Sequence, residues 1–69
     1  MNNNHYTYRV FWSPEDEEYV GLCAEFPSLS WLDVQAEKAL KGIMNLVSEV
    51  IEDMQYNAEK VPIPLSHGK

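Results

Sequence analysis

The spacing of the apolar residues changes once along this chain, and that change limits the fold more than any other feature. Between residues 6 and 34, strand-favouring residues come in short runs that turn residues separate. Beyond residue 35, apolar residues recur at steps of three and four, the pattern of an amphipathic helix. The members of this stripe are Ala36, Ala39, Leu40, Ile43, Leu46, Val47, Val50, Ile51 and Met54. We therefore expect strands first and one long helix after them.

The first half of the chain predicts a β-hairpin followed by a short third strand. Residues 6–13 and 18–26 form the expected hairpin strands, joined by the charged turn at residues 14–17. Residues 29–34 form the third strand, after the break at Pro27. Alternation divides the second strand into two faces. One face carries Val20, Leu22, Ala24 and Phe26, and the other carries Tyr19, Gly21, Cys23 and Glu25.

The helix ends are predicted from capping residues. Either Asp33 or Gln35 serves as the N-cap, since Asp33 is the better chemical cap and Gln35 fits the start of the apolar stripe. Asn57 is the expected C-terminal stop. Gly42 lies inside the helix, where it would allow close packing on the sheet. Residues 61–65 hold two prolines, so they fit only an edge strand.

These elements predict an α+β fold: a two-layer β-β-β-α-β domain with an antiparallel sheet and one long helix on one sheet face. Residues 1–69 are too few for two domains. One helix covers only one face of such a sheet. We expect the uncovered face to show apolar or aromatic groups beside Arg9, Cys23 and Glu25, which is typical of an interaction surface.

Charge and composition exclude several classes of function. Five Lys and Arg face eleven Asp and Glu, for a net charge of −6. The basic residues are scattered, so direct nucleic-acid binding is not expected. An acidic surface favours a basic protein partner, although an ordinary solvated surface explains it as well. The apolar stretches are too short for a membrane span, and the first residues do not resemble a signal peptide, so we expect a cytoplasmic protein.

The chain offers little material for catalysis or for a metal site. Cys23 is the one cysteine and lies within an apolar strand, which predicts a buried, inert thiol and excludes an internal disulfide. The histidines stand near the two ends, without a partner thiol. We expect no enzyme activity, no cofactor and no structural metal. A short chain without these supports gains further burial by forming a homodimer or higher oligomer.

Several segments together resemble the HicB family of antitoxins. They are the hairpin over residues 8–27, the Leu29-Ser30-Trp31 segment, the Ala36-Glu37-Lys38-Ala39-Leu40 helix start and the Val61-Pro62-Ile63-Pro64 end. The resemblance covers about residues 6–65 and rests on the order and spacing of these segments. Two positions depart from the family pattern, since Ser28 replaces a glycine and Gln35 replaces a Ser or Thr at the helix start.

The resemblance implies a partial RNase H-like domain that binds HicA, a small basic RNase toxin, and covers its RNA-binding surface. It also implies self-association, and autorepression of transcription through a separate C-terminal DNA-binding domain. No such domain is expected within residues 1–69. An RNase H enzyme needs metal-binding carboxylates that begin on its first strand, and residues 6–13 contain none.

The sequence therefore predicts an antitoxin domain with acidic residues facing a basic toxin. The candidate partner-binding residues are Glu15, Asp16, Glu17, Glu18, Glu25, Glu49, Glu52 and Asp53. Two alternatives remain open. One is an oligomerisation or regulatory module without a toxin. The other is a metal-dependent hydrolase that uses the acids at residues 49, 52 and 53. Their helical spacing is equally typical of the solvent-exposed face of a helix.

Overall fold

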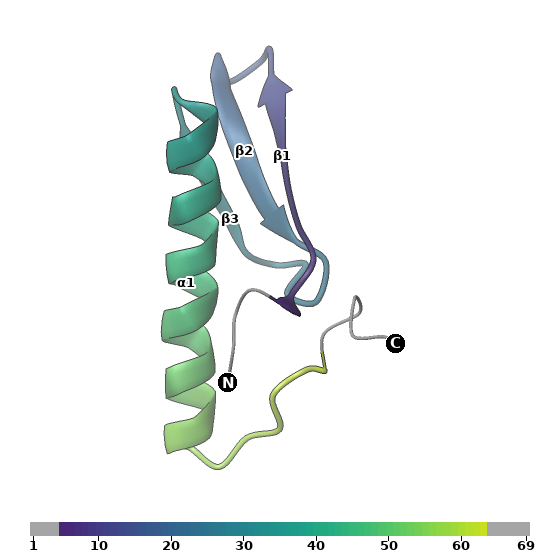
Figure 1. The fold of residues 1–69 in the computed structure, drawn as a ribbon, viewed down its shortest axis with the longest axis vertical. Coiled ribbons are helices and arrows are strands. Elements are labelled where there is room, and N and C mark those ends of the chain that lie inside the picture. The colour runs from purple at the N-terminus through teal and green to yellow at the C-terminus, as the bar shows by residue number, and fades with distance from the viewer. Residues whose placement is uncertain (1–4, 64–69) are drawn as a thin grey trace.

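The computed structural model describes residues 5–63, which form a three-stranded sheet and one helix packed on it. The strands are β1 (Tyr8–Ser13), β2 (Glu18–Cys23) and β3 (Ser30–Asp33), and the helix is α1 (Ala36–Tyr56). Figure 1 shows α1 running along one face of the sheet and extending beyond it at its C-terminal end. The predicted α+β arrangement of three strands followed by one helix is confirmed.

The sheet is antiparallel, and β2 is its central strand. Val20 of β2 pairs with Phe11 of β1 on one side and with Leu32 of β3 on the other. The hairpin turn at residues 14–17 is closed by the Ser13 hydroxyl, which donates to Asp16 Oδ2 over 2.9 Å. Glu17 completes the turn with a φ of 53°, a left-handed conformation that costs energy for a residue with a Cβ.

Gly21 decides which face of the sheet the helix covers. A Cβ placed at this position would lie 2.6 Å from the Ala39 carbonyl oxygen, so no other residue lets β2 approach the helix this closely. By alternation, Tyr19 and Cys23 share the helix side, and Val20 and Leu22 point away from it. The helix therefore lies on the Tyr19–Gly21–Cys23 face.

The core lies between this face and the apolar stripe of α1. Ile43 and Val47 are fully buried, and Cys23 is 1% exposed, which confirms the predicted burial of the thiol. Tyr6 and Phe26 belong to this core and make an edge-to-face contact, with 5.7 Å between their ring centroids. The stripe expected from the sequence thus packs on the sheet.

Gly42 allows the close packing on the sheet that its position in the sequence predicts. A Cβ at Gly42 would collide with the indole ring of Trp31, which therefore lies against the helix backbone. The Trp31 side chain itself stays 43% exposed. This contact positions β3, the shortest strand, along the N-terminal half of α1.

Both predicted helix ends are confirmed, with roles shared between two residues at the start. Gln35 is the N-cap by position, and its carbonyl accepts the Ala39 N–H over 3.0 Å. Asp33 Oδ1 instead accepts the N–H of Gln35 over 3.0 Å, just outside the helix. Asn57 is the C-cap, and Ala58 follows it with a left-handed φ of 60°.

Three expectations about the strands are corrected. The second strand ends at Cys23 rather than at residue 26, because the Phe26 N–H turns back to the Cys23 carbonyl over 3.1 Å. This turn breaks the alternation, so Phe26 is buried in the core instead of sharing a face with Val20. The third strand spans Ser30–Asp33, shorter than the expected residues 29–34. The first begins at Tyr8 rather than at residue 6.

The fourth strand expected at residues 61–65 is absent from the described part of that segment. Residues 61–63 form no strand, and residues 64–65 lie outside the described range. Proline at position 62 has no N–H to give to a ladder. The segment is nevertheless attached to the domain, because the Tyr6 hydroxyl donates to the Pro62 carbonyl over 2.7 Å.

Candidate functional site

The sheet face opposite the helix is a candidate site among the described residues. We call it the open face. Its members follow from the strand register and are Arg9, Phe11, Ser13, Glu18, Val20, Leu22, Ser30 and Leu32. No other element of residues 5–63 packs on this face, since the one helix lies on the other side of the sheet (Figure 1).

An apolar strip crosses the open face from one edge of the sheet to the other. Phe11, Val20 and Leu32 form this strip, one residue from each strand. Phe11 is 40% exposed and Leu32 is 39% exposed, whereas Val20 is buried between them. Side chains of this kind next to one another on an uncovered sheet are characteristic of a surface that meets another macromolecule.

Arg9 stands beside the strip. Its guanidinium carbon lies 5.1 Å from the centre of the Phe11 ring, a cation–π contact that holds the side chain down on the sheet. Its cross-strand partner is Leu22. The open face is therefore apolar at its centre and carries a cation on the side nearer to the start of β1.

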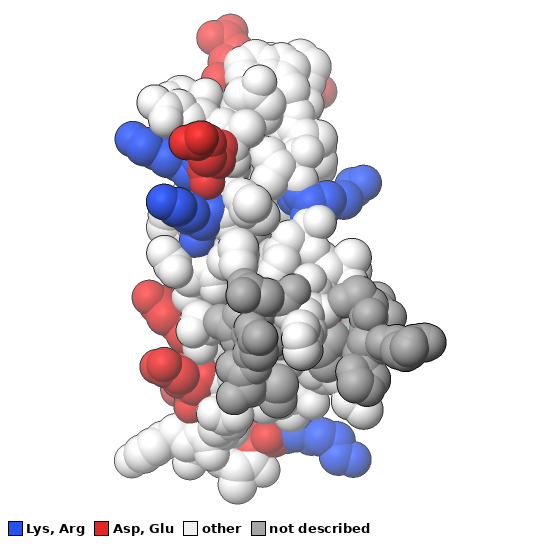
Figure 2. Space-filling model, in the orientation of Figure 1, with Lys and Arg blue, Asp and Glu red and all other residues white. Residues whose placement is uncertain are grey.

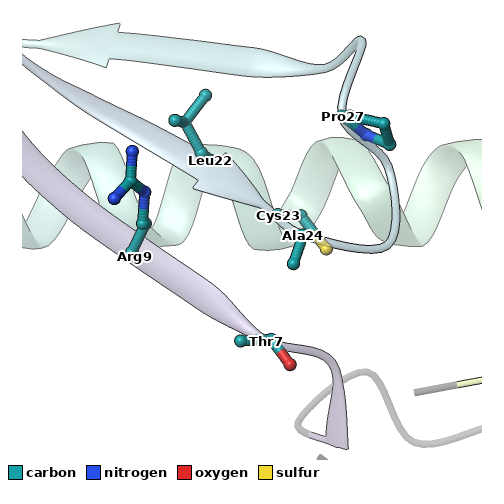
Figure 3. Close-up of a pocket in the computed structure, with 6 residues that line it drawn as sticks. All are labelled: Thr7, Arg9, Leu22, Cys23, Ala24 and Pro27. Atoms are coloured by element: carbon teal, nitrogen blue, oxygen red, sulfur yellow. The ribbon is translucent and has the colours of Figure 1, made fainter. Parts of the chain in front are cut away.

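A hollow of about 200 Å³ lies next to Arg9 (Figure 3). Its wall combines the start of the hairpin with the loop after β2. The lining residues are Thr7, Arg9, Leu22, Cys23, Ala24 and Pro27. Figure 3 shows Arg9 and Leu22 on neighbouring strands and Pro27 at the loop. The lining is apolar apart from Arg9 and the Thr7 hydroxyl, so the hollow suits an apolar side chain from a partner rather than a polar substrate.

The uncovered face was expected to carry Arg9, Cys23 and Glu25 together, and this is wrong for Cys23. Arg9 lies on the open face, but Cys23 pairs with Tyr8 on the helix side. Both faces of β2 are apolar in sequence, so apolar content could not decide between them. The glycine at position 21 was the usable signal, because only the face with the smallest residue lets a helix approach closely.

The candidate acids fall into separate groups. The turn acids are Glu15, Asp16, Glu17 and Glu18, and the helix acids are Glu49, Glu52 and Asp53. All are exposed except Glu18, which is half-buried. Figure 2 shows acidic groups at the hairpin-turn end and along the lower part of the helix, with basic groups between them. The structure therefore does not bring the turn acids and the helix acids together.

Glu25 differs from the other candidate acids because it binds its own chain. Its carboxylate accepts the Thr7 backbone N–H at 3.0 Å and 3.2 Å and the Thr7 hydroxyl at 3.1 Å. The Cys23 thiol donates to the same carboxylate over 3.4 Å. Glu25 thus joins the segment after β2 to the residue that precedes β1, a structural role that the sequence did not indicate.

The buried titratable groups near Glu25 are less acidic than usual. Burial raises the pKa of the Cys23 thiol, and burial also raises the pKa of Tyr8 to about 12, with the Cys23 and Glu25 charges adding to the effect. A thiol needs a lowered pKa to act as a nucleophile at neutral pH. This environment works in the opposite direction and leaves Cys23 protonated.

Residues 5–63 contain no group of three or more His, Cys, Asp or Glu side chains that could hold a metal ion. The helix in this described part of the chain lacks the apolarity that a membrane span needs.

Comparison of the chain with protein-family models, with curated proteins and with solved structures gave no match.

Proposed function

We propose that this chain is an antitoxin domain that binds a small basic RNase and covers its RNA-binding surface. The observation that carries the proposal is the distribution of charge. The chain has a net charge of −6, and exposed acids lie on the hairpin turn and on the second half of α1. Such a surface attracts a basic protein and repels RNA, which are the two properties that an RNase inhibitor needs.

The sequence of the strands also favours a binding role. The order β-β-β-α matches the first four elements of a partial RNase H-like β-β-β-α-β domain, and β1 carries no Asp or Glu. An RNase H reaction depends on carboxylates that hold metal ions, the first of them on that strand. We therefore propose the RNase H-like fold without its chemistry, in a domain that works by covering its partner.

The turn acids and the helix acids are the proposed contact residues, and Glu25 becomes the least favoured of the candidates. Its carboxylate already receives hydrogen bonds from Thr7 and Cys23. A partner would have to replace these bonds, and breaking them would leave the Thr7 N–H without its acceptor. A cytoplasmic location belongs to the same proposal, because the RNA that such a toxin cleaves is found there.

The proposal requires a gene for a small, Lys/Arg-rich protein next to the gene for this chain, and the test is a binding titration with an inactive form of that protein. Isothermal titration at about 50 mM salt should give a complex, and affinity should fall at least about tenfold at 500 mM because salt screens exposed charges. The active toxin should lose its RNase activity when one equivalent of this chain is added. If no complex forms at low salt, the proposal fails.

Two triple variants identify the contact group and act as controls for each other, because each removes three charges. One is Glu15→Gln/Asp16→Asn/Glu17→Gln, and the other is Glu49→Gln/Glu52→Gln/Asp53→Asn. The variant that neutralises the toxin-binding group should bind at least about tenfold more weakly, and the other variant should lose much less affinity. Equal, small effects of both variants would show that neither group carries the interaction.

A further inference from the structure

β1 lies at the edge of the sheet, and half of its backbone groups point away from the sheet (Figure 1). In an antiparallel ladder, residue pairs that exchange hydrogen bonds alternate with pairs that do not. The Ala24 N–H donates to the Thr7 carbonyl over 2.9 Å, so these two residues form a hydrogen-bonded pair. The register therefore turns the N–H and C=O groups of residues 9, 11 and 13 toward β2, and those of residues 8, 10 and 12 outward.

The outward groups of Tyr8, Val10 and Trp12 have no hydrogen-bond partner within residues 5–63, because β1 has a neighbouring strand only on the β2 side. Natural proteins usually protect such an edge with a proline, a lysine or a β-bulge. β1 contains no Pro or Lys, and its pairing with β2 continues without a bulge over all 6 residues. The backbone of β1 is therefore ready to accept another strand.

Exposed aromatic rings lie on both faces of this edge. Phe11 is 40% exposed on the open face, and Trp12 is 48% exposed on the helix side. An edge-to-face contact with Tyr19, with 5.1 Å between ring centroids, holds the Trp12 ring in place. The alternate side chains of an added strand would lie next to Phe11 on one face and next to Trp12 on the other. The edge thus offers apolar contacts on both faces in addition to backbone hydrogen bonds.

The hairpin turn determines which charge an added strand should carry. β1 leads directly into Glu15, Asp16 and Glu17, which are all exposed, and the turn contains no Lys or Arg. A strand that pairs with β1 has one of its ends beside this turn, where basic residues are attracted and acidic ones repelled. Arg9 lies toward the other end of β1 and disfavours a basic neighbour there.

We propose that β1 binds an extended segment of the basic RNase as an additional strand, with the basic residues of that segment beside the turn acids. Backbone hydrogen bonds supply affinity in this mode of binding, and alternate side chains supply specificity. The inference rests on the proposed function, because it assigns the way in which the same partner is held. It also favours the turn acids over the helix acids, since the helix acids lie on α1 and not at this edge.

Amide hydrogen exchange, measured by NMR on the full chain alone and with the inactive RNase at low salt, tests the proposal. In the free chain, the amides of residues 8, 10 and 12 should exchange faster than those of residues 9, 11 and 13. In the complex, the three outward amides should slow at least about tenfold, because they gain carbonyl partners.

The outcomes separate this inference from the proposed function. No complex at low salt overturns both, whereas a complex whose outward amides exchange as fast as in the free chain overturns the strand addition alone. Outward amides that are already protected in the free chain, and more so at higher concentration, would show that a second copy occupies the edge, which also contradicts the proposal.

Val10→Pro gives an independent test. It removes one outward N–H and leaves the hydrogen bonds to β2 in place, since Val10 belongs to a pair that does not exchange them. Val10→Ala is the matched control, because it shortens the side chain and keeps the N–H. The proline variant should bind the RNase at least about tenfold more weakly than the alanine variant. Equal affinities would contradict the proposal. Circular dichroism checks that both variants are folded, and the exchange measurement on the unaltered chain decides the question without them.

Discussion

At the scale of single residues, Gly21 has the greatest influence on the fold. Its missing side chain lets the helix backbone approach β2 and so selects the face that becomes the core. The sequence identified the hairpin and the helix, but it did not identify this choice, because residues on both faces of β2 are apolar. A single glycine, rather than the apolar pattern, decides whether the helix packs on the Gly21 face or on the opposite face of β2.

Gly21→Ala should destabilise the domain by about 1–3 kcal/mol, since the new Cβ meets the Ala39 carbonyl and backbone cannot move aside cheaply. Urea unfolding measures this loss. Gly42→Ala is the contrast, because its Cβ meets the half-exposed Trp31 ring rather than backbone, and the helix gains about 1 kcal/mol in propensity that offsets part of the cost of moving the ring. It should destabilise the domain less than Gly21→Ala and shift the Trp31 indole NMR signal. Equal losses from both variants would contradict this account.

Tyr6 and Tyr8 form a natural pair for testing buried hydroxyls. The Tyr6 hydroxyl donates to the Pro62 carbonyl, whereas the buried Tyr8 hydroxyl has no hydrogen-bond partner among the described residues. Tyr6→Phe should therefore cost about 1 kcal/mol in the free energy of unfolding, and Tyr8→Phe should be neutral or slightly stabilising. Chemical denaturation at pH 7 compares them. A larger loss from Tyr8→Phe than from Tyr6→Phe would contradict the assignment.

Alkaline pH gives a second test of Tyr8. Its folded pKa of about 12 lies above the ordinary value of 10.0, so the folded state holds this proton after the unfolded state has released it. Stability from this group is complete below pH 10 and is lost as pH rises from 10 to 12. The free energy of unfolding should fall over that range, and it should fall less steeply in Tyr8→Phe. Parallel curves for the two proteins would show that Tyr8 does not contribute.

At the scale of elements, the end of α1 combines a well-formed hydrogen-bond pattern with an unfavourable residue. The Ala58 N–H donates to the Gln55 carbonyl over 3.1 Å, and the Glu59 N–H donates to the Met54 carbonyl over 2.7 Å. This is the Schellman pattern, which places a left-handed residue at Ala58, a position that glycine occupies most readily.

Ala58→Gly should therefore stabilise the domain by about 0.5–1 kcal/mol, because it removes the cost of a Cβ in the left-handed conformation. Thermal unfolding should show a higher midpoint. Ala36→Gly, at the start of the same helix, is the matched control and should lower the midpoint. If both changes lower stability, the helix does not end in the described way.

Sequence patterns predicted the elements better than their ends. The hairpin, the third strand and the helix follow directly from spacing and turn residues. The early end of β2 did not, because the turn that buries Phe26 depends on a backbone bond to Cys23. The expected last strand was not found in residues 61–63, where the Tyr6–Pro62 hydrogen bond attaches the chain without a ladder.

At the scale of the whole molecule, the domain offers two surfaces of different character. The open face is apolar with one charge of each sign, and the turn acids and helix acids form exposed, mainly negative regions. The sequence predicted the acidity and the existence of an uncovered face. It did not predict which residues share that face, because their grouping depends on the side that the helix covers.

A titration of the chain with an inactive form of a small basic RNase, which the proposal places in a neighbouring gene, at about 50 mM and 500 mM salt tests the central proposal most directly. The account predicts a complex at low salt that weakens at least about tenfold at high salt, and loss of RNase activity when the active toxin meets one equivalent of the chain. No complex at low salt, or a complex that leaves the RNase fully active, would contradict it.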